Sequence, residues 1–189
     1  GQDKPMKTFI LALALAVSLL TQAATDTPAL AAEQTPSIES AFSPDAGGET
    51  LVLKVIASAN SQIRLAAYSF TSPHIARSLV DAKQRGVDVR VIADYKRNLG
   101  KPSMKALSQL VRAGIPTRTV AMYAMHHDKY IVVDERTVQN GSFNYTLTAA
   151  DLNSENVIVH WQHPELAQAF LQHWEDRWGK GVDYPSAAQ

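Results

Sequence analysis

The middle of the chain holds four residues whose side chains could together attack a phosphate ester: His127, Lys129, Ser142 and Asn144. A histidine supplies a nucleophile, and a lysine supplies positive charge for the phosphoryl oxygens. Hydroxyl and amide groups supply hydrogen bonds to the same centre. Because this set can attack a phosphodiester without a metal ion, we interpret the segment as a phosphate-handling active site that uses neither a metal nor a cofactor.

The spacing of the first two residues suits a β-strand. Residues two apart on a strand point to the same face, so His127 and Lys129 are expected to project together. Asp128 and Tyr130 are then expected to project to the opposite face. Nucleophile and cation would therefore share one site.

The second pair has the same spacing. Ser142 and Asn144 would also share a face if a strand continues through them, and Gly141 precedes them. A glycine at this point removes the side chain where backbone must approach a phosphate. Both pairs could then surround one phosphoryl group.

The complete motif reads His127-x-Lys129, four residues, Asp134, six residues, and Gly-Ser-x-Asn at residues 141–144. With this spacing the chain resembles the phospholipase D superfamily, and in particular its small bacterial endonucleases, which carry a single copy of the motif. The resemblance covers residues 40–184. Five spaced positions that match at once are a far more specific signal than one short motif.

The resemblance implies a role for each residue of the site. His127 would attack phosphorus to form a phosphohistidine, which water then cleaves. Lys129 and Asn144 would hold the nonbridging oxygens, and Ser142 would support the site by hydrogen bonding. Glu155 would bind the second ring nitrogen of His127, fix its tautomer and stabilise the imidazolium.

Two further sets of polar residues in or near the motif are weaker candidates for a catalytic or metal-binding role. Asp134 has the strand parity of Asp128, opposite to His127, so we expect it to support the site from behind rather than to react. His126 with Asp128 could suggest a metal site. No third ligand at matching spacing accompanies them, and the lysine of the motif would repel a cation.

The mechanism implied by the resemblance needs two histidines, whereas this chain carries one motif. The other histidines all lack a lysine two residues later: His74, His126, His160, His163 and His173. The second motif must then come from another subunit. We therefore predict a homodimer whose twofold axis passes through one shared active site.

The elements that must position these residues follow an α/β pattern. Helical and strand-like segments alternate in the first half, which favours a largely parallel sheet. The second half has strands separated by short loops, which favours antiparallel pairing. The expected helices are residues 49–60, 73–85, 103–113 and 164–178, and the expected strands are 62–70, 87–94, 115–120, 129–133, 137–141 and 155–161. We predict a single α/β domain, a mixed β-sheet flanked by helices on both faces.

The N-terminus has the pattern of a secretory signal peptide. The apolar run at residues 9–20 follows Lys4 and Lys7 and is too short to span a bilayer comfortably, which makes an uncleaved anchor the minority reading. We assign residues 1–31 to signal peptide and leader and 32–48 to a linker that enters the first strand. Residues 49–184 would form the phospholipase D-like nuclease domain, and 185–189 a tail.

Composition limits the location and the substrate contacts. A chain with this leader and no cysteine is expected to be a bacterial periplasmic or secreted protein without disulfides and without a stable membrane partner after leader cleavage. The 18 basic and 18 acidic residues give no net charge, so a nucleic acid would need a local basic patch. Lys96 and Arg97 follow the end of a strand and are the first candidates. Tyr123, in the loop before His127, is a further candidate for substrate contact.

Three functions remain open at this stage. The first is a metal-independent phosphodiesterase, a nonspecific endonuclease on DNA with RNA as an alternative substrate. The second is a phospholipase D acting on membrane phospholipids, although the chain beyond the leader has no obvious amphipathic membrane helix. The third is a noncatalytic nucleic-acid-binding protein, which the intact set of reactive residues disfavours.

Overall fold

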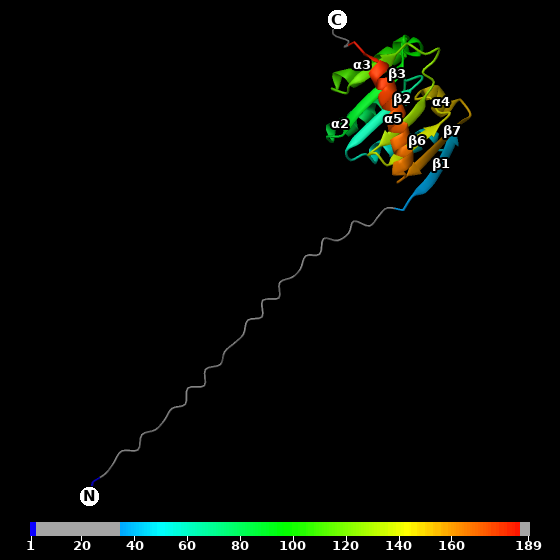
Figure 1. The fold of residues 1–189 in the computed structure, drawn as a ribbon. Helices are drawn as coiled ribbons and strands as arrows, with labels where there is room; N and C mark the ends of the chain where they lie inside the picture. Colours follow the sequence, from blue (N-terminus) through cyan, green and yellow to red (C-terminus); the bar gives the residue numbers. More distant parts are fainter. Residues whose placement is uncertain (3–34, 186–189) are drawn as a thin grey trace. The chain divides into compact units, whose positions relative to one another are not determined.

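A computed structural model describes residues 1–2 and 35–185 (Figure 1). The predicted signal peptide and most of the predicted tail lie outside the described residues. The described residues form one eight-stranded sheet in the order β1-β7-β6-β5-β2-β3-β4-β8. Its strands are β1 Ser37–Ser43, β2 Gln62–Ala67, β3 Asp88–Asp94, β4 Thr117–Val120, β5 Lys129–Val133, β6 Thr137–Gly141, β7 Glu155–Trp161 and β8 Val182–Asp183. The helices are α1 Gly48–Ala57, α2 Pro73–Gln84, α3 Lys101–Arg112, α4 Leu147–Asp151 and α5 Pro164–Lys180, with the 3-10 helix η1 Lys96–Asn98.

The sheet is mixed, as the sequence predicts. β3 pairs in parallel with both β2 and β4. β5 pairs antiparallel with β2, and β6, β7 and β1 continue the sheet by antiparallel pairing. The predicted fold class, a mixed sheet with helices on both faces in a single domain, is confirmed.

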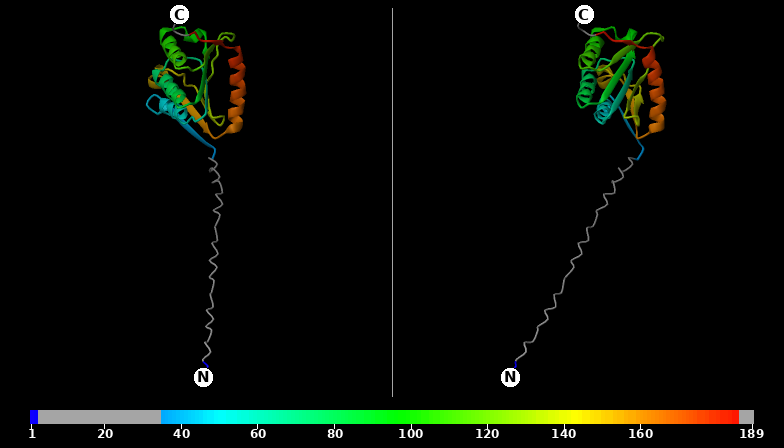
Figure 2. Two further views of the ribbon diagram at one scale, coloured as in Figure 1. Left: turned by 90° about the vertical axis from the view of Figure 1, so that its left-hand side faces the viewer. Right: turned by 60° about the vertical axis from the view of Figure 1, so that its left-hand side comes forward.

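Helices cover the two faces unequally. Figure 2 shows α5 alone on one side of the sheet and α1, α2 and α3 on the other. The larger apolar core lies beneath the three helices, and the smaller one lies beneath α5 around the buried Trp174. The indole Nε1 of Trp174 donates a hydrogen bond of 3.0 Å to the carbonyl of Leu65, which fixes α5 to the centre of the sheet.

The predicted linker at residues 32–48 is wrong in part, because it contains β1. This strand pairs with β7 along its whole length, from Ser37 opposite Trp161 to Ser43 opposite Glu155. An entry into the first strand was predicted within this segment, but not a strand that starts at Ser37. Its residues are mostly exposed and polar, as in many edge strands, so the chain gives little apolar alternation there. The short elements α4 and β8 also lack a clear sequence pattern.

The strand register brings the motif segments to one edge of the sheet. Ala67, at the end of β2, lies opposite Lys129, at the start of β5. Gly141 ends β6 beside this point and lies opposite Val157 of β7. We name this the carboxyl edge: the edge where β2, β3, β4 and β6 end and where β5 and β7 begin.

Candidate active site

His127 lies in the extended segment that leads into β5, at the carboxyl edge. Its side chain is exposed and makes no hydrogen bond to any of the described residues. Lys129 is half-buried, and its Nζ donates a hydrogen bond of 2.9 Å to the carbonyl oxygen of His127. His127 and Lys129 therefore lie together, as the strand spacing predicts, and the exposed imidazole is accessible to a ligand.

Tyr68 is a site residue that sequence reasoning missed. Its ring packs edge-on against His127, with 4.5 Å between centroids. Lys129 Nζ lies 5.3 Å from the centroid of the same ring, and the Arg97 guanidinium carbon lies 5.8 Å from it. The ring thus contacts the nucleophile and both cations. The available signal was its position directly after β2, since the carboxyl ends of strands in α/β sheets tend to bind ligands.

Glu155 is engaged by neighbours other than His127. One carboxylate oxygen accepts a short hydrogen bond from Ser142 Oγ, and the other accepts one of 2.9 Å from Asn153 Nδ2. No hydrogen bond joins Glu155 to His127 among the described residues. The expectation that Glu155 orients this imidazole is therefore not met in this subunit, where the carboxylate bonds to Ser142 and Asn153 instead.

Ser142 joins β6 to β7 rather than continuing a strand. β6 ends at Gly141, and Ser142 Oγ accepts hydrogen bonds from the backbone N–H and the Nδ2 of Asn156, at 3.0 and 3.3 Å. With its bond to Glu155, Ser142 ties the two strands together beside the site. Ser142 makes hydrogen bonds, as expected, but β6 ends before it, so the condition for a shared strand face of Ser142 and Asn144 is not met.

The structure requires a glycine at position 141 for a different reason from the one expected from the motif. Its φ of 143° lies in the region that favours glycine. A Cβ at this position would lie 2.3 Å from the backbone oxygen of Asn156. The absent side chain thus makes room for β7 rather than for a phosphate.

Asn144 is held beside the end of β2 by its neighbours. Phe143 and Tyr145 are fully buried, and the carbonyl of Tyr145 accepts hydrogen bonds of 2.9 Å from the N–H groups of Thr71 and Ser72. These contacts bring Asn144 to the loop that carries Tyr68. Its Oδ1 is buried without a hydrogen-bond partner among the described residues. Its Nδ2–H group also makes no hydrogen bond to them, so the amide can donate to a ligand.

The charge of Lys129 is set by two opposing effects. Burial lowers the pKa of its ammonium group, while the negative charges of Asp128 and Glu155 raise it. A bound phosphate would add further negative charge and favour the protonated lysine.

Asp134 does not support the site from behind. It lies past the far end of β5, where its carboxylate accepts hydrogen bonds from the backbone N–H groups of Asn60, Ser61 and Gln62 at 2.8–2.9 Å and from the Ser61 hydroxyl. The predicted place of Asp134 is wrong because the four strand residues 130–133 separate it from Lys129. It organises the turn between α1 and β2.

The two basic residues proposed to contact substrate, Lys96 and Arg97, differ in their contacts. Both Lys96 and Arg97 are exposed on η1, but contact with the Tyr68 ring is seen for Arg97. Asp94, which the sequence did not single out, holds this turn: its Oδ1 accepts the Arg97 N–H at 2.6 Å. Its Oδ2 accepts the His126 N–H at 2.8 Å, so one buried carboxylate ties the basic turn to the segment of the nucleophile.

Tyr123 packs against α5 rather than beside His127. Its hydroxyl accepts a hydrogen bond of 3.2 Å from Lys180 Nζ, and the Arg177 guanidinium lies 4.8 Å from its ring centroid. The predicted role in substrate contact is therefore not supported by its position.

Within residues 1–2 and 35–185, no group of three or more histidine, cysteine, aspartate or glutamate side chains is arranged to hold a metal ion.

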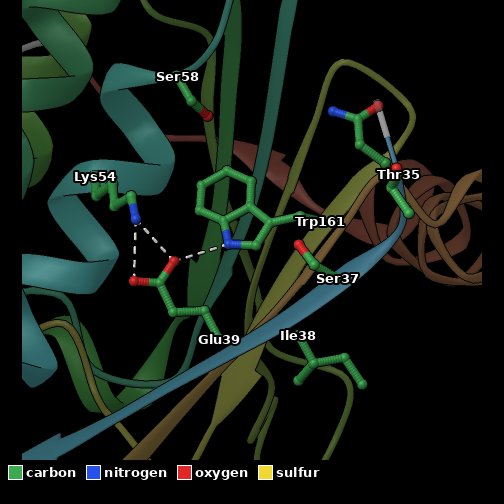
Figure 3. A pocket seen from close by; sticks show the side chains of 8 residues that line it. Thr35, Ser37, Ile38, Glu39, Lys54, Ser58 and Trp161 are labelled. Atoms are coloured by element: carbon green, nitrogen blue, oxygen red, sulfur yellow. Dashed lines mark hydrogen bonds and ion pairs between the residues drawn. The ribbon is translucent and has the colours of Figure 1, made fainter. Parts of the chain in front are cut away.

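A pocket of about 580 Å³ lies away from these residues, at the opposite end of β1 and β7 (Figure 3). Glu39 lines it and accepts hydrogen bonds from Lys54 and from the indole N–H of Trp161. Because Ser37 pairs with Trp161 while Ser43 pairs with Glu155, the pocket and the motif occupy different ends of the sheet. It carries none of the motif residues.

No helix in the described part of the chain has the length and apolarity to cross a membrane.

Comparison with known proteins agrees with the motif. Residues 52–178 match the family described as the cardiolipin synthase, PLD-like domain. The chain is 35% identical over 140 residues to phospholipase D of Rickettsia conorii, covering 74% of this chain and 68% of that protein. It is 34% identical over 128 residues to the mitochondrial cardiolipin hydrolase of Danio rerio, covering 67% of this chain and 55% of that protein.

Solved structures give the same answer. Nuc from Salmonella typhimurium, a phospholipase D family member, superposes with a TM-score of 0.80 at 47% identity, over 80% of this chain and all of that one. NucT from Helicobacter pylori shares the fold, with a TM-score of 0.69 at 20% identity over 79% of this chain and all of that one. With the reactive groups gathered at the carboxyl edge, these matches lead to one assignment: the chain belongs to the phospholipase D superfamily and is a phosphodiesterase of the Nuc-like type.

Proposed function

We propose that the protein is a metal-independent, nonspecific endonuclease that hydrolyses DNA, with RNA as an alternative substrate. The observation that carries the proposal is the exposed, unbonded imidazole of His127 beside the Lys129 ammonium and the Tyr68 ring. The similarity to Nuc, at 47% identity over the whole of that chain, supports a nuclease rather than a lipid enzyme. Arg97 at the same ring adds a cation for the nucleic-acid backbone.

The reaction proceeds in two balanced steps. A ring nitrogen of His127 attacks phosphorus, the bond to the leaving oxygen breaks, and that oxygen takes a proton from a second histidine. Water then attacks the phosphohistidine, gives a proton back to the second histidine and releases the phosphate end. Lys129 Nζ and the Nδ2–H group of Asn144 donate hydrogen bonds to the nonbridging oxygens as negative charge builds.

The second histidine is the partner subunit's copy of His127 in a homodimer. Two features support this arrangement: the chain has one His-x-Lys motif, and His127 is exposed at the carboxyl edge. A twofold axis through the edge would bring two imidazoles to one phosphate. The site would then be complete only in the dimer.

Mixed dimers test the shared site. Wild type and His127→Ala would be unfolded together in equal amounts and refolded. If both imidazoles are needed, activity falls to about one quarter of that of the same total amount of wild type, because only dimers of two wild-type subunits are active. If each subunit works alone, about one half remains, and the shared site is refuted. Sedimentation of the wild type gives the oligomeric state independently.

The substrate is tested by cleavage of single-stranded and duplex DNA and of RNA in excess EDTA. Cleavage by wild type and none by His127→Ala is the expected result. A requirement for added divalent metal would refute the metal-independent mechanism. Equal cleavage by the two proteins would move the nucleophile elsewhere.

A phospholipase D activity on membrane phospholipids is the second candidate. It is favoured by the similarity to the Rickettsia phospholipase D and by the exposed Leu99 and Met125 on loops at the carboxyl edge. Release of headgroup from phosphatidylcholine or cardiolipin vesicles, without DNA cleavage, would select it. A noncatalytic nucleic-acid-binding role would instead give DNA binding that His127→Ala leaves unchanged, with no cleavage.

The location follows from the leader. We place the mature protein in the bacterial periplasm or outside the cell, on the basis of the apolar run at residues 9–20 after two lysines. Fractionation of cells that express the full chain, with the size of the product measured by mass spectrometry, tests export and cleavage together. Cytoplasmic protein of full length would refute it.

A further inference from the structure

The two residues that flank the nucleophile in the chain both point away from it. His126 is buried, with 2% of its surface exposed, and its Nδ1 lies 3.5 Å from Asp128 Oδ2. The same carboxylate oxygen accepts a hydrogen bond of 2.8 Å from Nε2 of His173, on α5. His127, between them, contacts Tyr68 instead. The nucleophile is thus carried by a segment whose neighbouring side chains face the opposite side.

On this opposite side, α5 is packed firmly against the sheet. Next to His173, Trp174 is fully buried and bonded to the carbonyl of Leu65. One turn earlier, Phe170 packs edge-on against Tyr130 of β5, with 4.9 Å between centroids. α5 therefore cannot shift at this point without disturbing the smaller core, and the bond from His173 transfers that rigidity to Asp128.

The imidazole of His127 has no hydrogen bond to the described residues, and its ring contact is with Tyr68. Its position depends on the backbone of residues 126–128, which is held by the His126 N–H bond to Asp94, the Lys129 bond to the His127 carbonyl and the Asp128 bond to His173. Of these, only the last reaches across to α5. Catalytic geometry is sensitive at this level, because a misplacement of about 1 Å can cost on the order of a hundredfold in rate.

We propose that His173 is a positioning residue: through its hydrogen bond to Asp128 it holds the segment that aims His127 at phosphorus. The inference builds on the proposed phosphodiesterase reaction and assigns a function to α5 that the motif does not contain. His173 itself touches no substrate. Its Nε2–H is the group that matters, so a glutamine, whose amide N–H reaches a similar place, should replace it.

The test compares His173→Ala, His173→Gln and Asp128→Asn with wild type. We measure kcat and KM on a small chromogenic phosphodiester, bis(4-nitrophenyl) phosphate, and the melting temperature of each protein. His173→Ala is expected to lose about tenfold in kcat with little change in KM, since geometry rather than binding is impaired. His173→Gln should restore most of the loss, and Asp128→Asn, whose amide oxygen can still accept the bond from His173, should keep more activity than His173→Ala.

His160→Ala is the matched control. It also removes a half-buried histidine on the α5 side, but it lies on β7 opposite Val138, about 16 Å along the strand from Glu155. Its kcat should equal that of wild type. A wild-type kcat in His173→Ala, or a loss that His160→Ala shares and His173→Gln does not restore, would overturn the positioning role.

A second readout does not need activity. The ring resonances of His127 in a ¹H–¹⁵N spectrum should move in His173→Ala and remain near their wild-type values in His173→Gln and His160→Ala. If His127 resonances stay unchanged in His173→Ala, the inference is refuted whatever the substrate is. If wild type fails to cleave any phosphodiester while these shifts occur, the proposed function fails and the positioning contact stands.

Discussion

The motif residues at the two ends of β5 differ in how fully their side chains are hydrogen-bonded. At the carboxyl edge, His127 is exposed and its side chain has no hydrogen bond to the described residues, and Lys129 bonds only to a backbone carbonyl. At the other end, Asp134 receives four hydrogen bonds from a single turn. One end of the strand has capacity left for a ligand, and the other end has been used to build the fold.

The difference teaches how to read a motif whose residues are spaced along one strand. A side chain left unsatisfied at a strand end is available for chemistry, whereas one saturated by backbone donors has a structural task. Both kinds of residue can be required for activity, but for separate reasons. Five experiments can break or sharpen this comparison.

The largest effect is expected at the open end. His127→Ala should lower kcat/KM for phosphodiester cleavage by about 10³-fold or more, because the nucleophile is lost. The melting temperature should stay close to that of wild type, since the side chain is exposed. Steady-state kinetics and thermal unfolding give both numbers. Substantial residual activity would mean that the open end is not where the reaction occurs.

The saturated end should respond in the opposite way. Asp134→Ala should lower the free energy of unfolding by about 2 kcal/mol, because three backbone N–H groups lose their acceptor. Activity per folded molecule should change little. Urea unfolding and kinetics of the same sample measure both. A variant of wild-type stability with impaired kcat would remove the contrast between the two ends.

The Asp134 effect has a defined pH dependence. Partial burial raises the pKa of this carboxyl, but hydrogen bonds from Gln62, Ser61 and Asn60 outweigh burial and lower it. A carboxylate whose pKa is lowered by folding stabilises the protein above its ordinary pKa of about 3.9 and loses this contribution as the pH falls through the folded value. The stability difference between wild type and Asp134→Asn should therefore shrink in acid.

Tyr68 should give an intermediate effect on catalysis. Tyr68→Ala removes the ring between His127, Lys129 and Arg97 and is expected to lower kcat/KM by about tenfold. Tyr68→Phe keeps the ring and is the matched control, so its kcat/KM should stay within about twofold of wild type. Equal losses in the two variants would assign the effect to the hydroxyl instead.

The smallest effect concerns the charge of Lys129. Activity should fall as pH rises through the lysine pKa, which burial lowers and the charges of Asp128 and Glu155 raise. Glu155→Gln removes one of these negative charges, so the alkaline limb of kcat/KM should move to lower pH. Lys129→Arg, which stays charged, should remove the limb. A limb that stays fixed or moves upward in Glu155→Gln would exclude Lys129 as its origin.

Much of the fold could be predicted because the core elements have regular apolar patterns. The predicted strands 129–133, 137–141 and 155–161 have the bounds of β5, β6 and β7. β1 could not be found in this way, since an exposed polar edge strand is defined by its pairing with β7 and not by its own residues.

Whether a feature of the site could be predicted depends on how far apart in the sequence the contacting residues are. The shared location of His127 and Lys129 follows from spacing along one strand, so the sequence is enough. The roles of Tyr68, Asp94 and His173 depend on contacts with segments far away in the chain, which no local pattern encodes. Asp134 was misplaced for a related reason: strand parity gives a face of the sheet but not which end of the strand is the site.

The pairing of β1 with β7 also sets an order of events during synthesis. β1 is made early, yet its only neighbour in the sheet is β7, and its Glu39 and Ser43 bond to residues 122 and 106 positions later. Glu155, which bonds to Ser142, opens that late strand. A growing chain must therefore expose most of its sequence before the catalytic groups are in place. A chain stalled before Glu155 should leave the nucleic acid of its own cell intact, and cleavage by such stalled chains would show that the late strand is dispensable.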